Sequence, residues 1–219
     1  MEENKQNKKI NNGLWYRFVK RAFDIFSSFL AIVLLFWLFL IFLIVQLFVT
    51  KGHPIFADPR VGKSGKLFKV LKFRSMYYDA ESNIDKYLTP KQKDIWLRER
   101  KLDNDPRITK FGKFLRKTSL DELPQLFNIF IGQMSVVGPR PMSQREINDE
   151  FTDEQRVVIF MARPGLTGYW QVNGRSNVDF DSGKRQEMEV AYFYKRGIWF
   201  DFGLIFKTIP AVLKSKGAK

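Results

Sequence analysis

The sequence predicts a mostly helical α+β fold. An N-terminal membrane helix, re-entrant or spanning, precedes a small domain with short β-hairpin elements and interfacial helices. The first observation is an apolar run at residues 25–50 that contains no charged side chain. The second is the polar remainder, which lowers the mean hydropathy to −0.26 although 45% of the residues are hydrophobic. The third is charge: 37 Lys and Arg outnumber 23 Asp and Glu, giving a net charge of +14.

This composition restricts the chemistry available to the chain. A basic excess indicates an anionic partner, which is a nucleic acid, an anionic lipid surface or a phosphorylated substrate. The absence of cysteine excludes disulfides and thiolate-bound zinc, and a single histidine, His53, excludes multi-histidine zinc sites and His-based triads. Any acid, base or nucleophile must therefore be a carboxylate, a hydroxyl, Lys or Tyr.

The apolar run is long enough to cross a membrane. As one straight helix, residues 25–50 would extend about 39 Å, more than the ~30 Å hydrocarbon core. Residues 1–21 carry six Lys or Arg and residues 51–74 carry seven, and basic flanks prefer the cytosol. No Pro or Gly marks a break, so a straight span and a re-entrant hairpin both remain open. Because both flanks are basic, we expect the re-entrant form.

The rest of the chain predicts one domain without linkers or repeats. We expect a basic polar tail over 1–21, a membrane helix over 22–50 and a membrane-associated domain over 51–219. Residues 65–76 alternate basic and apolar side chains, which predicts a strand. Tyr169–Val172 is strand-like and runs into a hairpin-turn signal, Asn173-Gly174. Helices are predicted at 90–101, 110–117, 121–131, 143–161 and 187–215, the last of them aromatic, basic and suited to a membrane interface.

A pair of adjacent carboxylates, Asp121 and Glu122, lies in a basic stretch. One interpretation is helix capping, because Ser119 and Glu122 have the spacing of a capping box and Asp121 could itself be the N-cap. The other is chemistry. A helix N-terminus beside Arg116 favours an ionised carboxylate, which is a competent nucleophile toward phosphorus. Glu122 is then a candidate ligand for Mg²⁺, which takes carboxylate and phosphate oxygens.

Several cations are candidates for binding phosphate groups. Arg140 lies between two prolines in Gly138-Pro139-Arg140-Pro141, and a guanidinium on a stiff backbone suits bidentate phosphate binding. A turn with a solvated charge explains the same residues equally well. Lys72, Arg163 and Arg175 are further candidates, each of which could also be an ordinary surface charge.

Five segments in order give the chain a resemblance to a known family. They are KRAFD before the apolar run, FKVLKFRSM, DPRITKFGKFLRKTSLDELPQLFNIFIGQMSVVGPRP, RPGLTGYWQVNGR and a C-terminal aromatic helix. Together they cover nearly the whole chain, and the long central block is highly specific. The chain resembles the monotopic phosphoglycosyl transferases, the bacterial sugar transferases that act as undecaprenyl-phosphate sugar phosphotransferases.

The resemblance implies an activity and its residues. A UDP-sugar donor would give its sugar phosphate to undecaprenyl phosphate, a polyprenyl phosphate, releasing UMP in the first step of cell-surface polysaccharide assembly. The family's catalytic dyad falls on Asp121 and Glu122, with Asp121 forming a covalent phosphosugar intermediate and Mg²⁺ required. The arginine before the dyad falls on Arg116, and that of the Pro-Arg-Pro motif on Arg140.

The resemblance also implies a location and partners. The catalytic domain would lie on the cytoplasmic face of the bacterial inner membrane and contact membrane lipids. No nucleic-acid motif is present, and a homo-oligomer is neither indicated nor excluded. Larger relatives add N-terminal spans, so this chain is expected to be the minimal catalytic form.

One departure from the family concerns the membrane helix. Family members commonly carry a helix-breaking proline midway through that helix, where this chain has Phe36-Trp37-Leu38-Phe39. The alternative to an enzyme is a basic, membrane-anchored module that recruits anionic lipids or an assembly partner. That module would not require a carboxylate pair inside the most basic stretch.

Overall fold

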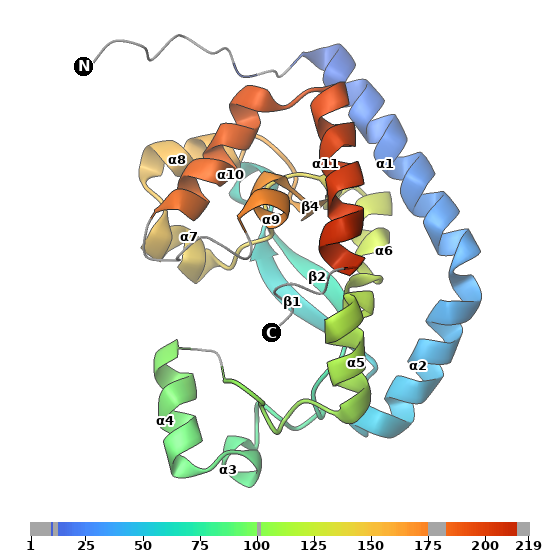
Figure 1. The fold of residues 1–219 in the computed structure, drawn as a ribbon, viewed down its shortest axis with the longest axis vertical. Helices are drawn as coiled ribbons and strands as arrows, with labels where there is room; N and C mark the ends of the chain where they lie inside the picture. The colour runs from blue at the N-terminus through green and yellow to red at the C-terminus, as the bar shows by residue number, and fades with distance from the viewer. Residues whose placement is uncertain (1–9, 11–12, 100–101, 175–182, 214–219) are drawn as a thin grey trace. The chain divides into compact units, whose positions relative to one another are not determined.

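The protein is mostly helical, with a few short strands. The computed structural model describes residues 10, 13–99, 102–174 and 183–213 (Figure 1). In chain order the elements are α1 (Leu14–Leu34), α2 (Phe36–Thr50), β1 (Ile55–Val61), η1 (Lys63–Gly65), β2 (Leu67–Phe73), α3 (Ile84–Tyr87), α4 (Pro90–Glu99), α5 (Lys110–Thr118), η2 (Leu120–Glu122), α6 (Gln125–Phe130), β3 (Ser135–Val137), α7 (Gln144–Glu150), α8 (Asp153–Ile159), β4 (Gly165–Thr167), α9 (Tyr169–Asn173), α10 (Lys184–Lys195) and α11 (Ile198–Leu213). Two compact units result, each built from separate parts of the chain. Of the described residues, the first unit combines 10, 13–32, 59–70, 125–174 and 183–213, and the second combines 33–58, 71–99 and 102–124.

The apolar run forms two helices rather than one. α1 ends at Leu34 and α2 begins at Phe36, because Leu35 leaves the helical conformation (φ −96°, ψ 8°). Among the described residues, no single helix is both long and apolar enough to cross a membrane, whereas α1 and α2 satisfy that test as a pair bent by 65°. A break therefore occurs without a proline.

The core of the first unit joins helices and strands that lie far apart in the sequence. Strands β3 and β4 pair in parallel, with Ser135 opposite Gly165 and Val137 opposite Thr167. Asp24 of α1 accepts hydrogen bonds from the Ser135 hydroxyl and the Val136 amide, which attaches α1 to β3. The buried apolar cluster consists of Val61, Val137, Met142, Ile147, Phe151, Ile159, Tyr192, Phe193 and Leu204.

The second unit has an aromatic core. Phe42 of α2 contacts Phe73 at the end of β2 and Phe111 of α5, with ring centroids 5.6 Å apart in both pairs. Phe39 adds a third contact with Phe73 at 5.7 Å. The apolar helix α2 is thus packed against α5, the helix that precedes the carboxylate pair.

The strand predicted at residues 65–76 is confirmed. Strands β1 and β2 form a two-stranded sheet, and β2 lies within the predicted range. The connection is short: the Gly62 amide donates to the Lys66 carbonyl, and Ser64 and Gly65 both have positive φ. Helices α4 and α5 also match their predictions closely.

Two predicted helices are each divided into two. Thr152 interrupts 143–161 because its hydroxyl caps the amide of Gln155 while the Gln155 side chain accepts from the Thr152 amide, a capping box that starts α8. The segment 187–215 is divided between α10 and α11, since Arg196 leaves the helical conformation (φ −58°, ψ 139°) and Gly197 follows it. The capping pair Thr152 and Gln155 was the local signal for the first of these boundaries.

The predicted strand at Tyr169–Val172 is wrong. Residues 169–173 form the short helix α9, in which the Asn173 side chain donates to the carbonyl of Tyr169 at 2.8 Å. Asn173-Gly174 ends this helix rather than turning a hairpin, and Gly174 donates its amide to the carbonyl of Trp170. An Asn-Gly pair serves helix ends as well as hairpin turns.

Candidate functional site

Helix α5 is positioned by direct contact with the backbone of Ser75. Thr109, the N-cap of α5, donates its amide to the Ser75 carbonyl at 3.0 Å and caps the Gly112 amide through its hydroxyl. A Cβ on Gly112 would lie 1.9 Å from the Ser75 carbonyl oxygen, so only glycine allows this approach. The approach sets the position of Arg116, one turn further along α5.

Arg116 is oriented by the side chain of the same serine. Its Nε–H donates to the Ser75 hydroxyl at 2.7 Å, and the residue is half-buried. Burial lowers the pKa of the guanidinium, while the charges of Asp121 and Asp105 oppose that change. With Nε held by Ser75, the two terminal nitrogens form the face of Arg116 that remains for an anion.

The carboxylate pair lies on a 3₁₀ turn instead of capping a helix. Ser119 has a left-handed conformation (φ 57°) and makes no side-chain capping bond, so the capping-box prediction is wrong. Asp121 is inside the turn η2 and is not the N-cap of α6, which begins at Gln125. The Leu123 amide donates to the Leu120 carbonyl, which is a 3₁₀ hydrogen bond. Pro124 has no amide hydrogen and cannot donate the next bond.

The two carboxylates are adjacent to two cations. Glu122 Oε1 lies 3.1 Å from Nζ of Lys72, and both side chains are about one-third exposed, at 36% and 31%. Burial raises the pKa of the Asp121 carboxyl to about 6; the Glu122 charge also raises it, and Lys72 and Arg116 lower it. Arg116 favours the ionised carboxylate as expected, but burial outweighs the two cations, so the net pKa of Asp121 is raised.

This arrangement suits nucleophilic attack on an anionic phosphorus centre. At neutral pH a carboxyl with a pKa of about 6 is mostly ionised, and partial desolvation leaves it more reactive than a solvated carboxylate. Lys72 and Arg116 reduce the repulsion between the carboxylate and an incoming phosphate. The second unit thus brings together Lys72, Arg116, Asp121 and Glu122, four of the residues that the sequence indicated.

Two more predicted residues, Arg140 and Arg163, belong to the first unit. Glycines bring their segments into contact, because a Cβ on Gly138 would lie 2.4 Å from the Arg163 carbonyl and one on Gly165 would lie 2.1 Å from the Gly138 nitrogen. Arg163 donates its Nε–H to the Gly132 carbonyl at 2.6 Å, a contact that ties it to the end of α6. Arg175 lies outside the described residues.

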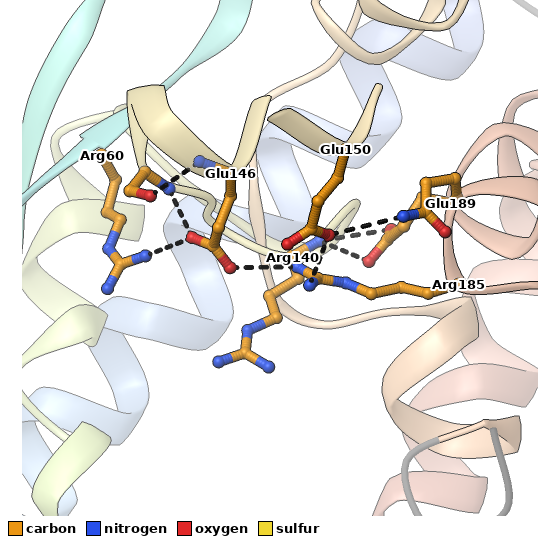
Figure 2. Close-up of polar contacts among 8 residues, drawn as sticks. Arg60, Arg140, Glu146, Glu150, Arg185 and Glu189 are labelled. Carbon is orange, nitrogen blue, oxygen red and sulfur yellow. Dashed lines mark hydrogen bonds and ion pairs between the residues drawn. The ribbon is translucent and has the colours of Figure 1, made fainter. Parts of the chain in front are cut away.

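Arg140 borders a partly buried network of acids and arginines that sequence reasoning missed (Figure 2). The Arg140 amide donates to both carboxylate oxygens of Glu189 at 3.3 Å. Arg185 donates to Glu146 at 3.3 Å and to Glu150 at 3.2 Å. These contacts join α7 and α10, and no local spacing in the sequence announces them.

Mg²⁺ is compatible with the carboxylate pair. Among residues 10, 13–99, 102–174 and 183–213, no group of three or more His, Asp or Glu side chains is arranged to hold a metal ion. Mg²⁺, however, is usually bound by one or two carboxylates together with substrate phosphates and water. Glu122, exposed by about a third beside Asp121, offers oxygen ligands of that type.

Comparison with known proteins assigns the family. A family model described as bacterial sugar transferase matches residues 15–215. The chain is 43% identical over 204 residues to the UDP-galactose-lipid carrier transferase of Erwinia amylovora, covering 92% of this chain and 42% of that protein. It is 42% identical over 204 residues to the undecaprenyl-phosphate galactose phosphotransferase of Salmonella typhimurium, with the same coverage.

A third relative is similar over most of its own length. The chain is 40% identical over 201 residues to the exopolysaccharide production protein ExoY of Rhizobium meliloti, covering 91% of this chain and 87% of ExoY. The chain therefore spans less than half the length of the two transferases above and most of ExoY. On the match of residues 15–215 and these identities, the chain belongs to the bacterial sugar transferase family.

Proposed function

We propose that the protein transfers a sugar phosphate from a UDP-sugar to undecaprenyl phosphate, producing undecaprenyl diphosphate sugar and UMP. The observation that carries this proposal is the half-buried Asp121 carboxylate beside Lys72 and Arg116. The names of two relatives, a UDP-galactose-lipid carrier transferase and an undecaprenyl-phosphate galactose phosphotransferase, support the substrate classes. The product would begin the assembly of a cell-surface polysaccharide.

The reaction is proposed to proceed in two displacements. In the first, a carboxylate oxygen of Asp121 attacks the β-phosphorus of the UDP-sugar and forms a new P–O bond. The bond between that phosphorus and the bridging oxygen breaks, and UMP leaves. In the second, an oxygen of undecaprenyl phosphate attacks the same phosphorus, the bond to Asp121 breaks and the free carboxylate returns. Lys72 and Arg116 offset the phosphate charge during both displacements.

Mg²⁺ is the proposed cofactor, with Glu122 as its protein ligand. When bound, it would neutralise phosphate charge and hold the donor phosphates near the carboxylate pair. Lys72, which contacts Glu122 at 3.1 Å, would keep that side chain in place. Arg140, on its Pro-Arg-Pro backbone, is proposed to bind a phosphate of the donor.

The helix pair α1–α2 is proposed to enter and leave the cytoplasmic leaflet of the bacterial inner membrane on the same side. The bend of 65° supports this, as do large apolar side chains exposed on both helices: Phe26 67%, Trp37 72% and Phe48 78%. Trp199 of α11, 87% exposed, is suited to the membrane interface. The domain would then meet its cytosolic donor and its lipid acceptor at the membrane surface.

The test is turnover by the full chain in nanodiscs supplied with a panel of UDP-sugars. We expect UMP release that continues only with undecaprenyl phosphate, a phosphosugar adduct on Asp121 with donor alone, and loss of both on Asp121→Asn. EDTA should abolish turnover and Mg²⁺ should restore it. Asp149→Asn is the matched control, because Asp149 is exposed and pairs only locally with Arg145. Absence of any adduct together with an active Asp121→Asn variant would eliminate the covalent mechanism. A basic recruiting module would release no UMP from any donor.

A further inference from the structure

We propose that Glu189 is a positioning residue that fixes the Pro-Arg-Pro loop through the backbone amide of Arg140, so that the Arg140 side chain is presented to a phosphate of the donor. The inference rests on the proposed function for the identity of that ligand. Glu189 lies in the middle of α10 and is completely buried. Nothing in its local sequence separates it from Glu187, the other acid of α10.

Glu189 binds the Pro-Arg-Pro loop through the amide of Arg140. Pro139 and Pro141 have no N–H, so Arg140 carries the only backbone donor of residues 139–141. Both oxygens of Glu189 accept that donor at 3.3 Å. Neighbouring backbone bonds hold the two ends of the loop, from the Gly138 amide to the Thr167 carbonyl and from the Gly165 amide to the Pro139 carbonyl before Arg140, and from the Val61 amide to the Met142 carbonyl after it. Glu189 binds the middle of the loop, between these ends.

The Arg140 side chain leads away from the carboxylate that holds its backbone (Figure 2). Its guanidinium carbon lies 5.4 Å from the ring centroid of Trp170, which is 3% exposed. The guanidinium of Arg185 lies 5.1 Å from the same ring and is fixed by Glu146 and Glu150. Glu189 thus fixes the amide of Arg140, and the Trp170 ring contacts its guanidinium. Arg185 contacts the same ring.

A buried carboxylate at residue 189 lowers the stability of the fold, so stability does not explain its presence. Burial raises the pKa of Glu189 to about 7, although the Arg140 amide and the charges of Arg185 and Arg140 all act in the opposite direction. An apolar side chain of the same length would avoid this desolvation cost. What only an acceptor at residue 189 provides is a partner for the Arg140 amide.

The experiment compares two nearly isosteric variants of the full chain, Glu189→Met, which has no acceptor, and Glu189→Gln, which keeps one. We expect Glu189→Met to raise KM for the UDP-sugar about tenfold or more, as for loss of a hydrogen bond from a buried group, with a smaller change in kcat. Glu189→Gln should stay within about threefold of wild type in KM. Glu189→Asp, one methylene shorter, should follow the Met variant.

Two further measurements separate positioning from a general loss of structure. In an Arg140→Ala background, Glu189→Met should add no further loss, because its effect passes through Arg140. Ile159→Val is the matched control, because Ile159 is buried in the apolar cluster of the first unit, is none of the proposed binding residues, and loses only one methyl group. It should lower the melting temperature and leave KM for the donor unchanged.

The hydrogen-exchange rate of the Arg140 amide reports whether the loop is held in place, and its measurement does not depend on catalysis. The Arg140 amide should exchange faster in Glu189→Met than in wild type or Glu189→Gln. Wild-type KM and unchanged exchange in Glu189→Met would overturn the inference, as would losses that add to those of Arg140→Ala. If the wild-type protein turns over no UDP-sugar, the proposed function fails, and the exchange of the Arg140 amide still decides whether Glu189 holds the loop.

Discussion

At the scale of single residues, Asp121 illustrates two opposed effects on one carboxyl group. Lys72 and Arg116 stabilise its ionised form, while burial and the adjacent Glu122 charge destabilise it. The net result is a pKa of about 6, above the ordinary value of 3.8. A carboxylate that is both ionised at neutral pH and poorly solvated is reactive, so the conflict serves the proposed chemistry.

Ser75 is the residue on which the direction of Arg116 depends. Removing its hydroxyl leaves a charged, half-buried donor without its acceptor, which costs about 1.5–3 kcal/mol. We expect Ser75→Ala to lower kcat/KM about tenfold or more, with a smaller relative effect on melting temperature. Thr118→Ala is the control, because the Thr118 hydroxyl bonds only within α5, to Phe114 and Leu115. Equal losses of activity in both variants would mean that the serine supports α5 and does not direct Arg116.

At the scale of elements, the break between α1 and α2 occurs at Leu35 without a proline, so the local sequence did not mark its position. Ser27 and Ser28 bond one turn back, to the carbonyls of Phe23 and Asp24, and so do not reach Leu35. Each half is instead held by its own unit. Arg21 of α1 donates to the carbonyls of Ile129 and Phe130, and Phe42 of α2 packs against Phe73 and Phe111. Tertiary contacts of the two halves thus accompany a bend that the local sequence does not encode.

The proposed same-side topology predicts a labelling pattern in this cysteine-free chain. Single cysteines at Asn7 and at Ser64, on either side of the helix pair, should both resist a membrane-impermeant thiol reagent in intact cells and react after lysis. Thirteen Lys or Arg flank the apolar run on its two sides, so only this arrangement keeps all of them in the cytosol. The cysteine-free parent is the control for background labelling. Reaction of the Asn7→Cys protein alone in intact cells would establish a straight span instead.

At the scale of the whole molecule, the buried acids set how stability depends on pH. Glu189 has a folded pKa raised to about 7, so between its ordinary pKa of 4.5 and 7 the folded state binds more protons than the unfolded state. Its contribution is therefore favourable at low pH and is lost as the pH rises through about 7. Two acids with depressed pKa values, Asp105 and Glu146, act in the opposite sense, but only as the pH falls below about 4.5.

We therefore expect the free energy of unfolding to fall by about 1 kcal/mol between pH 6 and pH 8 from Glu189 alone. The melting temperature in detergent should decrease over this interval. Glu189→Gln should remove most of that decrease, since an amide does not titrate. A pH dependence that is identical in wild type and Glu189→Gln would show that other groups cause it.

The sequence by itself determined the family, the carboxylate pair, the apolar run and the elements whose signals are local. β2 follows from alternation, and α4 and α5 follow from capping residues and helical periodicity. These signals involve residues only a few positions apart, so they can be recognised in the sequence. The same locality produced the errors: Ser119 and Glu122 have capping spacing without a cap, and Asn173-Gly174 has hairpin residues without a hairpin.

Only the tertiary structure decided how the candidate site is supported. Ser75 and Arg116 are 41 positions apart, Lys72 and Glu122 are 50 apart, and Glu189 and the amide of Arg140 are 49 apart. The pKa of Asp121 was likewise decided by burial, which no spacing records. The physical reason is common to all four: desolvation and hydrogen bonding depend on which groups the packed chain brings together, and sequence spacing specifies only neighbours within a turn or a strand.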